Sequence, residues 1–204
     1  MPWALHYMAR HFFEPVLLSG LEDPVSGTVS VHLTNDLPTE VTGTVRWSVT
    51  DARGRRLADG TRRAAARPLA DTVVETIRLK KHMEAQGPRD LIVWLEFTGA
   101  EGQRSRNMVL FGRPKHLQLA PARVSAGIKA RKDGAFDVSL SSKAPALWTW
   151  LELEGMDGTF SDNFIHVCPG HAESIRVVPK RTLTMAQFRK ALRVRSLFDT
   201  STAR

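Results

Sequence analysis

The sequence predicts an all-β protein built from two tandem immunoglobulin-like antiparallel β-sandwiches, with a short helix at the amino terminus and another near the carboxyl terminus. Two observations support this prediction. Apolar and polar residues alternate over many short segments, which is the pattern of half-buried strands. Turn residues separate these segments at regular intervals, as in a sandwich. The 204 residues are enough for two domains of ordinary size.

Residues 1–14 are predicted to form a helix that ends before Pro15. Its apolar side chains recur at helical spacing along one stripe, formed by Leu5, Met8, Ala9 and Phe12. Trp3 and Tyr7 lie four residues apart on the opposite side. A helix with large aromatic residues on two faces needs cover on both. We therefore expect Trp3 and Tyr7 to contact a neighbouring domain or subunit that is missing from this chain.

The first sandwich is predicted over residues 15–113, where the pattern changes to a period of two. The expected strands are 15–22, 28–33, 44–50, 55–59, 72–80, 91–98 and 106–111. Residues 62–67 are interpreted as an exposed connection or an edge strand, because charge there guards against edge-to-edge pairing. The cysteine pair of many immunoglobulin domains is absent, so the expected likeness is one of architecture.

A linker at residues 114–122 and a second sandwich at residues 123–204 complete the prediction, because prolines and a glycine bracket an extended segment there. The expected strands are 125–130, 136–140, a hairpin over 146–170, 172–178 and 192–198. Thr184 followed by Gln187 fits a capping box, which predicts a short helix that ends near Ala191.

Composition argues against several classes of function. The formal net charge is +8, and six basic residues with no acidic one fall in Lys180–Arg195. Such a basic segment can bind a polyanion, but it has one aromatic residue for base stacking, so no nucleic-acid partner is expected. No apolar run approaches the length of a membrane span, and no membrane partner is expected. The scattered histidines and the single Cys168 predict no metal site and no cofactor.

Two candidate features lie in the hairpin. Trp148 and Trp150 are two residues apart on one strand, where indole rings can stack on sugars; core packing is the commoner fate of tryptophan in a sandwich, and both interpretations stay open. Ser161, Asp162 and Asn163 begin the second strand, where such side chains more often bond local backbone than bind calcium. No pair of carboxylates suggests a catalytic acid and base, so no catalytic residue is predicted.

Five stretches, in order, resemble the β-mannosidases of glycoside hydrolase family two. They are PWALHYMARHFFEPVLLS (2–19), VHLTNDL (31–37), FGRPKHLQL (111–119), GTFSDNFIHVCPG (158–170) and ALRVRSLFDT (191–200). The resemblance covers essentially the whole chain. It implies a five-domain enzyme that removes terminal β-D-mannose residues by a retaining mechanism, with its catalytic glutamates in a (β/α)₈ barrel.

The resemblance places this chain in the last two domains of such an enzyme, with residues 1–14 resembling the end of the barrel. No position matches the catalytic glutamates, so the chain alone is expected to have no mannosidase activity. The expected function is a non-catalytic accessory region that supports the barrel, its main partner. The alternative is an autonomous carbohydrate-binding module, with mannose-containing oligosaccharides as ligands.

Overall fold

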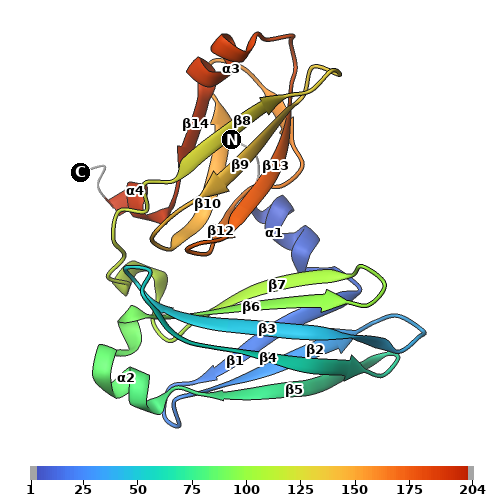
Figure 1. The fold of residues 1–204 in the computed structure, drawn as a ribbon, viewed down its shortest axis with the longest axis vertical. Helices are drawn as coiled ribbons and strands as arrows, with labels where there is room; N and C mark the ends of the chain where they lie inside the picture. Colours follow the sequence, from blue (N-terminus) through green and yellow to red (C-terminus); the bar gives the residue numbers. More distant parts are fainter. Residues whose placement is uncertain (1–3, 202–204) are drawn as a thin grey trace. The chain divides into compact units, whose positions relative to one another are not determined.

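The computed structural model describes residues 4–201 as two compact units. Residues 9–118 form one unit, and residues 4–8 join residues 119–201 in the other. The division after Gln118 falls inside the segment 114–122 that the sequence marks as a linker. Each unit consists of two facing antiparallel sheets (Figure 1), so the prediction of two tandem β-sandwiches is confirmed.

The first unit has one sheet of three strands and one of four. The three-stranded sheet has the order β1-β2-β5, with β1 at Val16–Asp23, β2 at Thr28–Asn35 and β5 at Ala70–Arg78. The four-stranded sheet has the order β4-β3-β6-β7, with β4 at Arg56–Ala66, β3 at Val41–Asp51, β6 at Leu91–Gly99 and β7 at Arg104–Leu110. Three short helices lie between or after strands: α2 (Lys80–Gln86), η1 (Pro88–Asp90) and η2 (Pro114–His116).

Alternation along the strands builds the core of the first unit. Successive side chains of a strand point to opposite faces, so one apolar row from each sheet meets between them. Fully buried members of this core include Leu18, Val31, Leu33, Val45, Val93 and Phe97. Gly60 of β4 lies opposite Trp47 of β3, and a Cβ at this glycine would lie 2.5 Å from the indole ring. The glycine therefore makes room for the tryptophan beneath an edge strand.

The second unit repeats the arrangement with a four-stranded and a three-stranded sheet. The first has the order β11-β13-β9-β8, with β11 at Gly158–Phe160, β13 at Ala172–Pro179, β9 at Phe136–Ser141 and β8 at Ser125–Ala130. The second has the order β12-β10-β14, with β12 at Ile165–Val167, β10 at Ala146–Leu153 and β14 at Leu192–Arg195. Its helices are α3 (Met185–Ala191), α4 (Leu197–Ser201) and the first part of α1 (Ala4–Phe12).

An aromatic pair lies in the core of the second unit. Phe188 of α3 is fully buried, and its ring stacks on Phe136 of β9 with centroids 3.9 Å apart. The capping box predicted for this helix is present, because Thr184 accepts from the backbone of Gln187 and the Gln187 side chain accepts from the backbone of Thr184. The cap fixes where α3 begins, and the apolar pair fixes which face it buries.

The structure differs from the sequence prediction in several elements. The predicted hairpin over residues 146–170 is interrupted, because the chain between β10 and β12 joins the other sheet as β11. Residues 62–66 belong to an edge strand, which confirms one of the two interpretations, but this strand is β4, which also contains the segment predicted to end at residue 59. Helix α2 was not predicted, because its seven residues are too few to show helical periodicity. The last strand ends at Arg195 rather than at residue 198, because the Asp199 carboxylate accepts hydrogen bonds from Ser196 N and Oγ and starts α4 there.

Candidate functional site

The corner Ser161-Asp162-Asn163 lies where the chain crosses from one sheet of the second unit to the other. It follows β11, a strand of the four-stranded sheet, and precedes β12, a strand of the three-stranded sheet. Ser161 extends the pairing with β13, since its backbone N–H donates to Arg176 O at 2.8 Å and its Oγ accepts from Arg176 N at 2.8 Å. The Asp162 carboxylate accepts from the backbone of Asn163. One end of the corner is thus bonded to the first sheet.

Asn163 bonds the other end of the corner to the second sheet. Its side chain is 1% exposed and forms two hydrogen bonds with the backbone of Leu151 in β10. Leu151 N donates to Asn163 Oδ1 at 2.8 Å, and Asn163 Nδ2 donates to Leu151 O at 3.0 Å. The side-chain amide therefore replaces a neighbouring strand at this point of β10 and satisfies two buried backbone groups.

Trp148 and Trp150 lie on the face of β10 that points away from the core. Both are half-buried, whereas Leu147, Thr149 and Leu151 between and beside them are fully buried. The strand carries a register shift between Ala146 and Thr149, and Trp148 adopts φ +46°. A non-glycine residue in this region is strained, so the surroundings must hold Trp148 in place.

Each tryptophan has an aromatic neighbour from the next segment of chain. The Trp148 ring meets His166 edge-on at 4.9 Å, and Trp148 N donates to His166 Nδ1 at 3.2 Å. The Trp150 ring stacks on Phe164 at 5.9 Å with an angle of 12° between the planes. One face of the Trp150 indole is therefore already occupied, which leaves Trp148 as the better candidate for stacking on a sugar.

Tyr7 of α1 extends this aromatic layer. Its ring lies 6.5 Å from that of Phe164 and is tilted by 39° to it, so the aromatic layer runs from Tyr7 through Phe164 to Trp150. Burial is the main cause that raises the pKa of the Tyr7 hydroxyl, and the charge of Asp162 raises it further. The predicted contact of Tyr7 with a missing barrel stays a prediction. Trp3, its predicted companion, lies outside the described residues.

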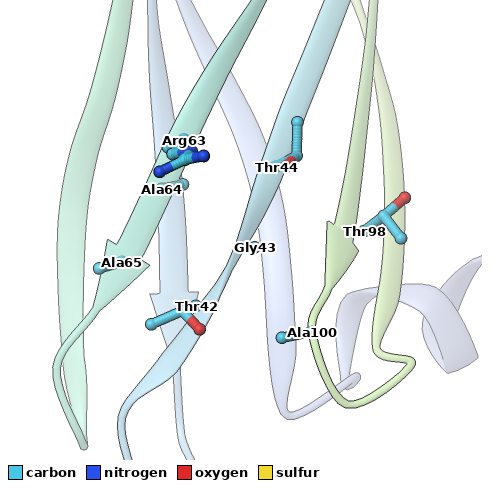
Figure 2. Close-up of a pocket in the computed structure, with 8 residues that line it drawn as sticks. All are labelled: Thr42, Gly43, Thr44, Arg63, Ala64, Ala65, Thr98 and Ala100. Atoms are coloured by element: carbon cyan, nitrogen blue, oxygen red, sulfur yellow. The ribbon is translucent and has the colours of Figure 1, made fainter.

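A hollow of about 550 Å³, open to solvent, lies at one end of the four-stranded sheet of the first unit. It is lined by Thr42, Gly43, Thr44, Arg63, Ala64, Ala65, Thr98 and Ala100 (Figure 2). Three hydroxyl groups and one guanidinium are the polar side-chain groups of this lining, which contains no carboxylate. The sequence alone does not reveal this set, because its members come from three strands and one turn that only the strand register brings together.

Comparison with known proteins accounts for both units. Residues 27–116 match the mannosidase Ig/CBM-like domain family, and residues 119–200 match an Ig-fold domain family of mannosidases. The chain belongs to the immunoglobulin-like domains of β-mannosidases. β-Mannosidase A of Aspergillus aculeatus is 29% identical over 209 residues, and that of Aspergillus terreus is 25% identical over 213 residues. The matches cover 95% and 97% of this chain but 22% of each relative.

Solved structures show the same fold as this pair of β-mannosidase domains. A β-D-mannosidase from Dictyoglomus thermophilum superposes with a TM-score of 0.77 at 20% identity, covering 94% of this chain and 22% of that one. An exo-chitosanase from Amycolatopsis orientalis superposes with a TM-score of 0.61 at 15% identity, covering 94% and 26%. This β-mannosidase domain pair therefore spans about a quarter or less of the proteins to which it is similar.

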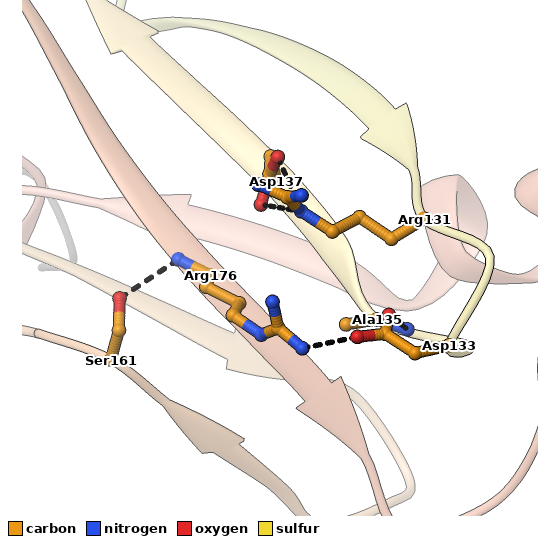
Figure 3. Close-up of polar contacts among 6 residues, drawn as sticks. All are labelled: Arg131, Asp133, Ala135, Asp137, Ser161 and Arg176. Atoms are coloured by element: carbon orange, nitrogen blue, oxygen red, sulfur yellow. Dashed lines mark hydrogen bonds and ion pairs between the residues drawn. The ribbon is translucent and has the colours of Figure 1, made fainter.

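Several exposed charges of the second β-mannosidase domain form ion pairs. In Figure 3, Arg131 donates to Asp137 at 2.9 Å and Arg176 to Asp133 at 2.5 Å. The hydrogen bond from Ala135 N and the ion pair with Arg176 lower the pKa of Asp133. Within the basic segment Lys180–Arg195, three cations have carboxylate partners in the pairs Lys180–Asp157, Arg193–Glu154 and Arg195–Glu152. Half of the basic residues in that segment are thus neutralised by carboxylates on neighbouring elements.

The possible metal ligands and the single thiol were the other candidates for a chemical site. Within residues 4–201, no three side chains of histidine, cysteine, aspartate or glutamate are grouped so as to hold a metal ion. Cys168 is half-buried, with its thiol 3.8 Å from the carbonyl oxygen of Pro169. No helix in the described part of the chain is both long and apolar enough to span a membrane.

Proposed function

We propose that this chain is a non-catalytic accessory region of a β-mannosidase-type glycoside hydrolase and supports the catalytic barrel of that enzyme. The observation that carries the proposal is the pair of family matches. Two mannosidase domain families follow one another in this chain, and the same residues align with 22% of β-mannosidase A from Aspergillus aculeatus. The parent enzyme would hydrolyse terminal β-D-mannose residues.

The chemistry of the described residues supports a non-catalytic role. A retaining glycosidase needs two carboxyl groups about 5 Å apart on either side of the scissile bond, in a concave site. The hollow of the first unit has no carboxylate in its lining. Glu152 lies in strand β10 and Glu154 directly after it, and they form ion pairs with Arg195 and Arg193. Their charges serve local pairing across β10 and β14.

Exposed apolar side chains on and just after α1 support the barrel as partner. Leu5 is 73% exposed, Phe12 58% and Phe13 84%. Large apolar groups gathered on one short segment mark an interaction surface more often than scattered single ones do. We infer that a preceding domain covers the side of the helix that carries Leu5 and Phe12 in the parent enzyme, opposite the side from which Tyr7 contacts Phe164.

The experiment that tests the proposal is turnover of an aryl β-mannoside by the purified chain. We expect release of the phenol at the rate of a protein-free blank. Turnover above the blank that survives repurification would contradict the proposal. A matched control is the E152Q/E154Q variant, since any true activity that depended on these carboxylates would then disappear, whereas that of a contaminant would not.

A carbohydrate-binding module is the second candidate function, and the outward position of Trp148 favours it. Its ring is half-buried and points away from the core, and its aromatic contact within residues 4–201 is the edge-on one with His166. Titration calorimetry with manno-oligosaccharides tests this role. Binding heat that is lost in W148A but kept in F164A would support a carbohydrate-binding role. The absence of binding heat with the unmodified chain would contradict it.

A further inference from the structure

The outer face of the sheet β4-β3-β6-β7 carries a row of arginine and threonine side chains. Thr44 of β3 lies opposite Arg63 of β4 on one side and Thr98 of β6 on the other, and Thr98 lies opposite Arg104 of β7. Directly paired residues share a face of a sheet. The row Arg63-Thr44-Thr98-Arg104 therefore crosses all four strands. Neighbouring strands are about 4.8 Å apart, so its two arginines begin about 14 Å apart.

A second row beside it adds more positive charge. Arg46 lies opposite Thr61 and Glu96, and Glu96 lies opposite Arg106. Glu96 is the one carboxylate of these two rows, and Arg106 Nη2 pairs with it at 3.1 Å. Four arginines thus face one acid. A surface with no binding role ordinarily mixes both signs of charge, because gathered like charges repel.

Three of these guanidinium groups are available to a ligand. Arg46, Arg63 and Arg104 are exposed, and no hydrogen bond or ion pair within residues 4–201 involves their side chains. Arg63 also borders the hollow in which the hydroxyls of Thr42, Thr44 and Thr98 lie (Figure 2). Guanidinium groups bind phosphate, sulfate and carboxylate through paired N–H donors, and hydroxyls both donate to and accept from sugar hydroxyls.

We propose that this face, formed by the two rows and the hollow, binds a linear oligosaccharide that carries anionic groups such as phosphate. The arginines contact the anions and the threonines contact the sugar hydroxyls. The lining of the hollow contains no aromatic ring, whereas proteins that bind single-stranded nucleic acid stack bases on such rings. The shallow, open form of the hollow suits a chain that lies across the strands. This inference goes beyond the accessory role and does not depend on it.

The test is affinity electrophoresis of the full chain in gels that contain phosphomannan or the same mannan after removal of its phosphate. We expect retardation by phosphomannan alone, and we expect it to weaken as ionic strength rises from 20 to 300 mM. The variant R46Q/R63Q/R104Q should bind about tenfold more weakly, since three charge-assisted contacts are lost.

The matched control is R181Q/R189Q/K190Q, which removes the same charge from the exposed basic segment of the second unit and should bind like the unmodified chain. Circular dichroism establishes that both variants fold. Equal retardation by the two mannans, loss of binding in the control variant, or tighter binding of an oligodeoxynucleotide than of phosphomannan would each overturn the proposal. Turnover of an aryl β-mannoside would contradict the accessory role and leave this proposal standing, so the two failures are distinguishable.

Discussion

Replacement of Asn163 by alanine tests whether the corner holds the two sheets of the second unit together. The substitution removes the partners of Leu151 N and Leu151 O, which lie on a fully buried residue. It also removes the acceptor for Phe164 N at 3.1 Å. Each buried backbone group that loses its partner costs about 1–3 kcal/mol. We expect N163A to lower the free energy of unfolding of this unit by about 3 kcal/mol.

Differential scanning calorimetry measures this effect. For a domain of this size, 1 kcal/mol shifts the melting temperature by roughly 4–8 °C, so the transition of the second unit should fall by roughly 12 °C or more. The control is S161A, because Ser161 is exposed and water can replace its contact with Arg176 N; its cost should stay below about 1 kcal/mol. If N163A and S161A lie within about 0.5 kcal/mol of each other, Asn163 does not hold β10 as described.

Two further predictions concern the first unit. G60A should lower its free energy of unfolding by about 1–3 kcal/mol, because the added Cβ would lie 2.5 Å from the Trp47 ring. G112A is the control, since the atom nearest to its added Cβ would be 3.7 Å away. Equal denaturant midpoints for the two variants would show that Gly60 does not make room for Trp47. The hydrogen bond with His32, and after it that with Thr34, lowers the pKa of Asp71. A lowered carboxylate pKa stabilises the fold above the ordinary value of about 3.9 and loses this effect as pH falls through the folded value. The stability difference between the unmodified chain and D71N should therefore shrink below pH 4 in urea titrations, and a difference that grows with acid would contradict this assignment.

The inner faces of both sandwiches could be predicted from the sequence because they follow from the chain locally. Alternation in Thr44–Thr50 and Leu91–Thr98 shows which side chains point inward, and β3 and β6 contain these residues. Turn residues then set where strands end, as at Gly54, whose backbone N–H donates to Asp51 O. Local signals of this kind need no knowledge of which strands are neighbours.

The outer faces could not be predicted in the same way, because their chemistry depends on strand order and register. Arg63 and Arg104 are 41 positions apart in the chain, and only the pairing of β4 with β3, β3 with β6 and β6 with β7 places them in one row. Strand β10 gives a second case in which the register of the strands decides the position of a side chain. Its sequence indicates that Trp148 and Trp150 share a face, but not that a register shift gives Trp148 a positive φ beside His166.

At the corner Ser161-Asp162-Asn163, the residue types can be read locally from the sequence, whereas the strand that they bond cannot. Its residue types are those that bond local backbone, which the sequence already indicates. Its consequence is not local, since Asn163 bonds β10, a strand that ends ten residues earlier in the chain. Because the same strand presents Trp148 and Trp150 on the face away from the core, any loosening at Asn163 should disturb the aromatic layer that includes Tyr7, Phe164 and Trp150. The buried hydrogen bonds at one edge of β10 thereby determine how well its outward face can be positioned for a ligand or a neighbouring domain.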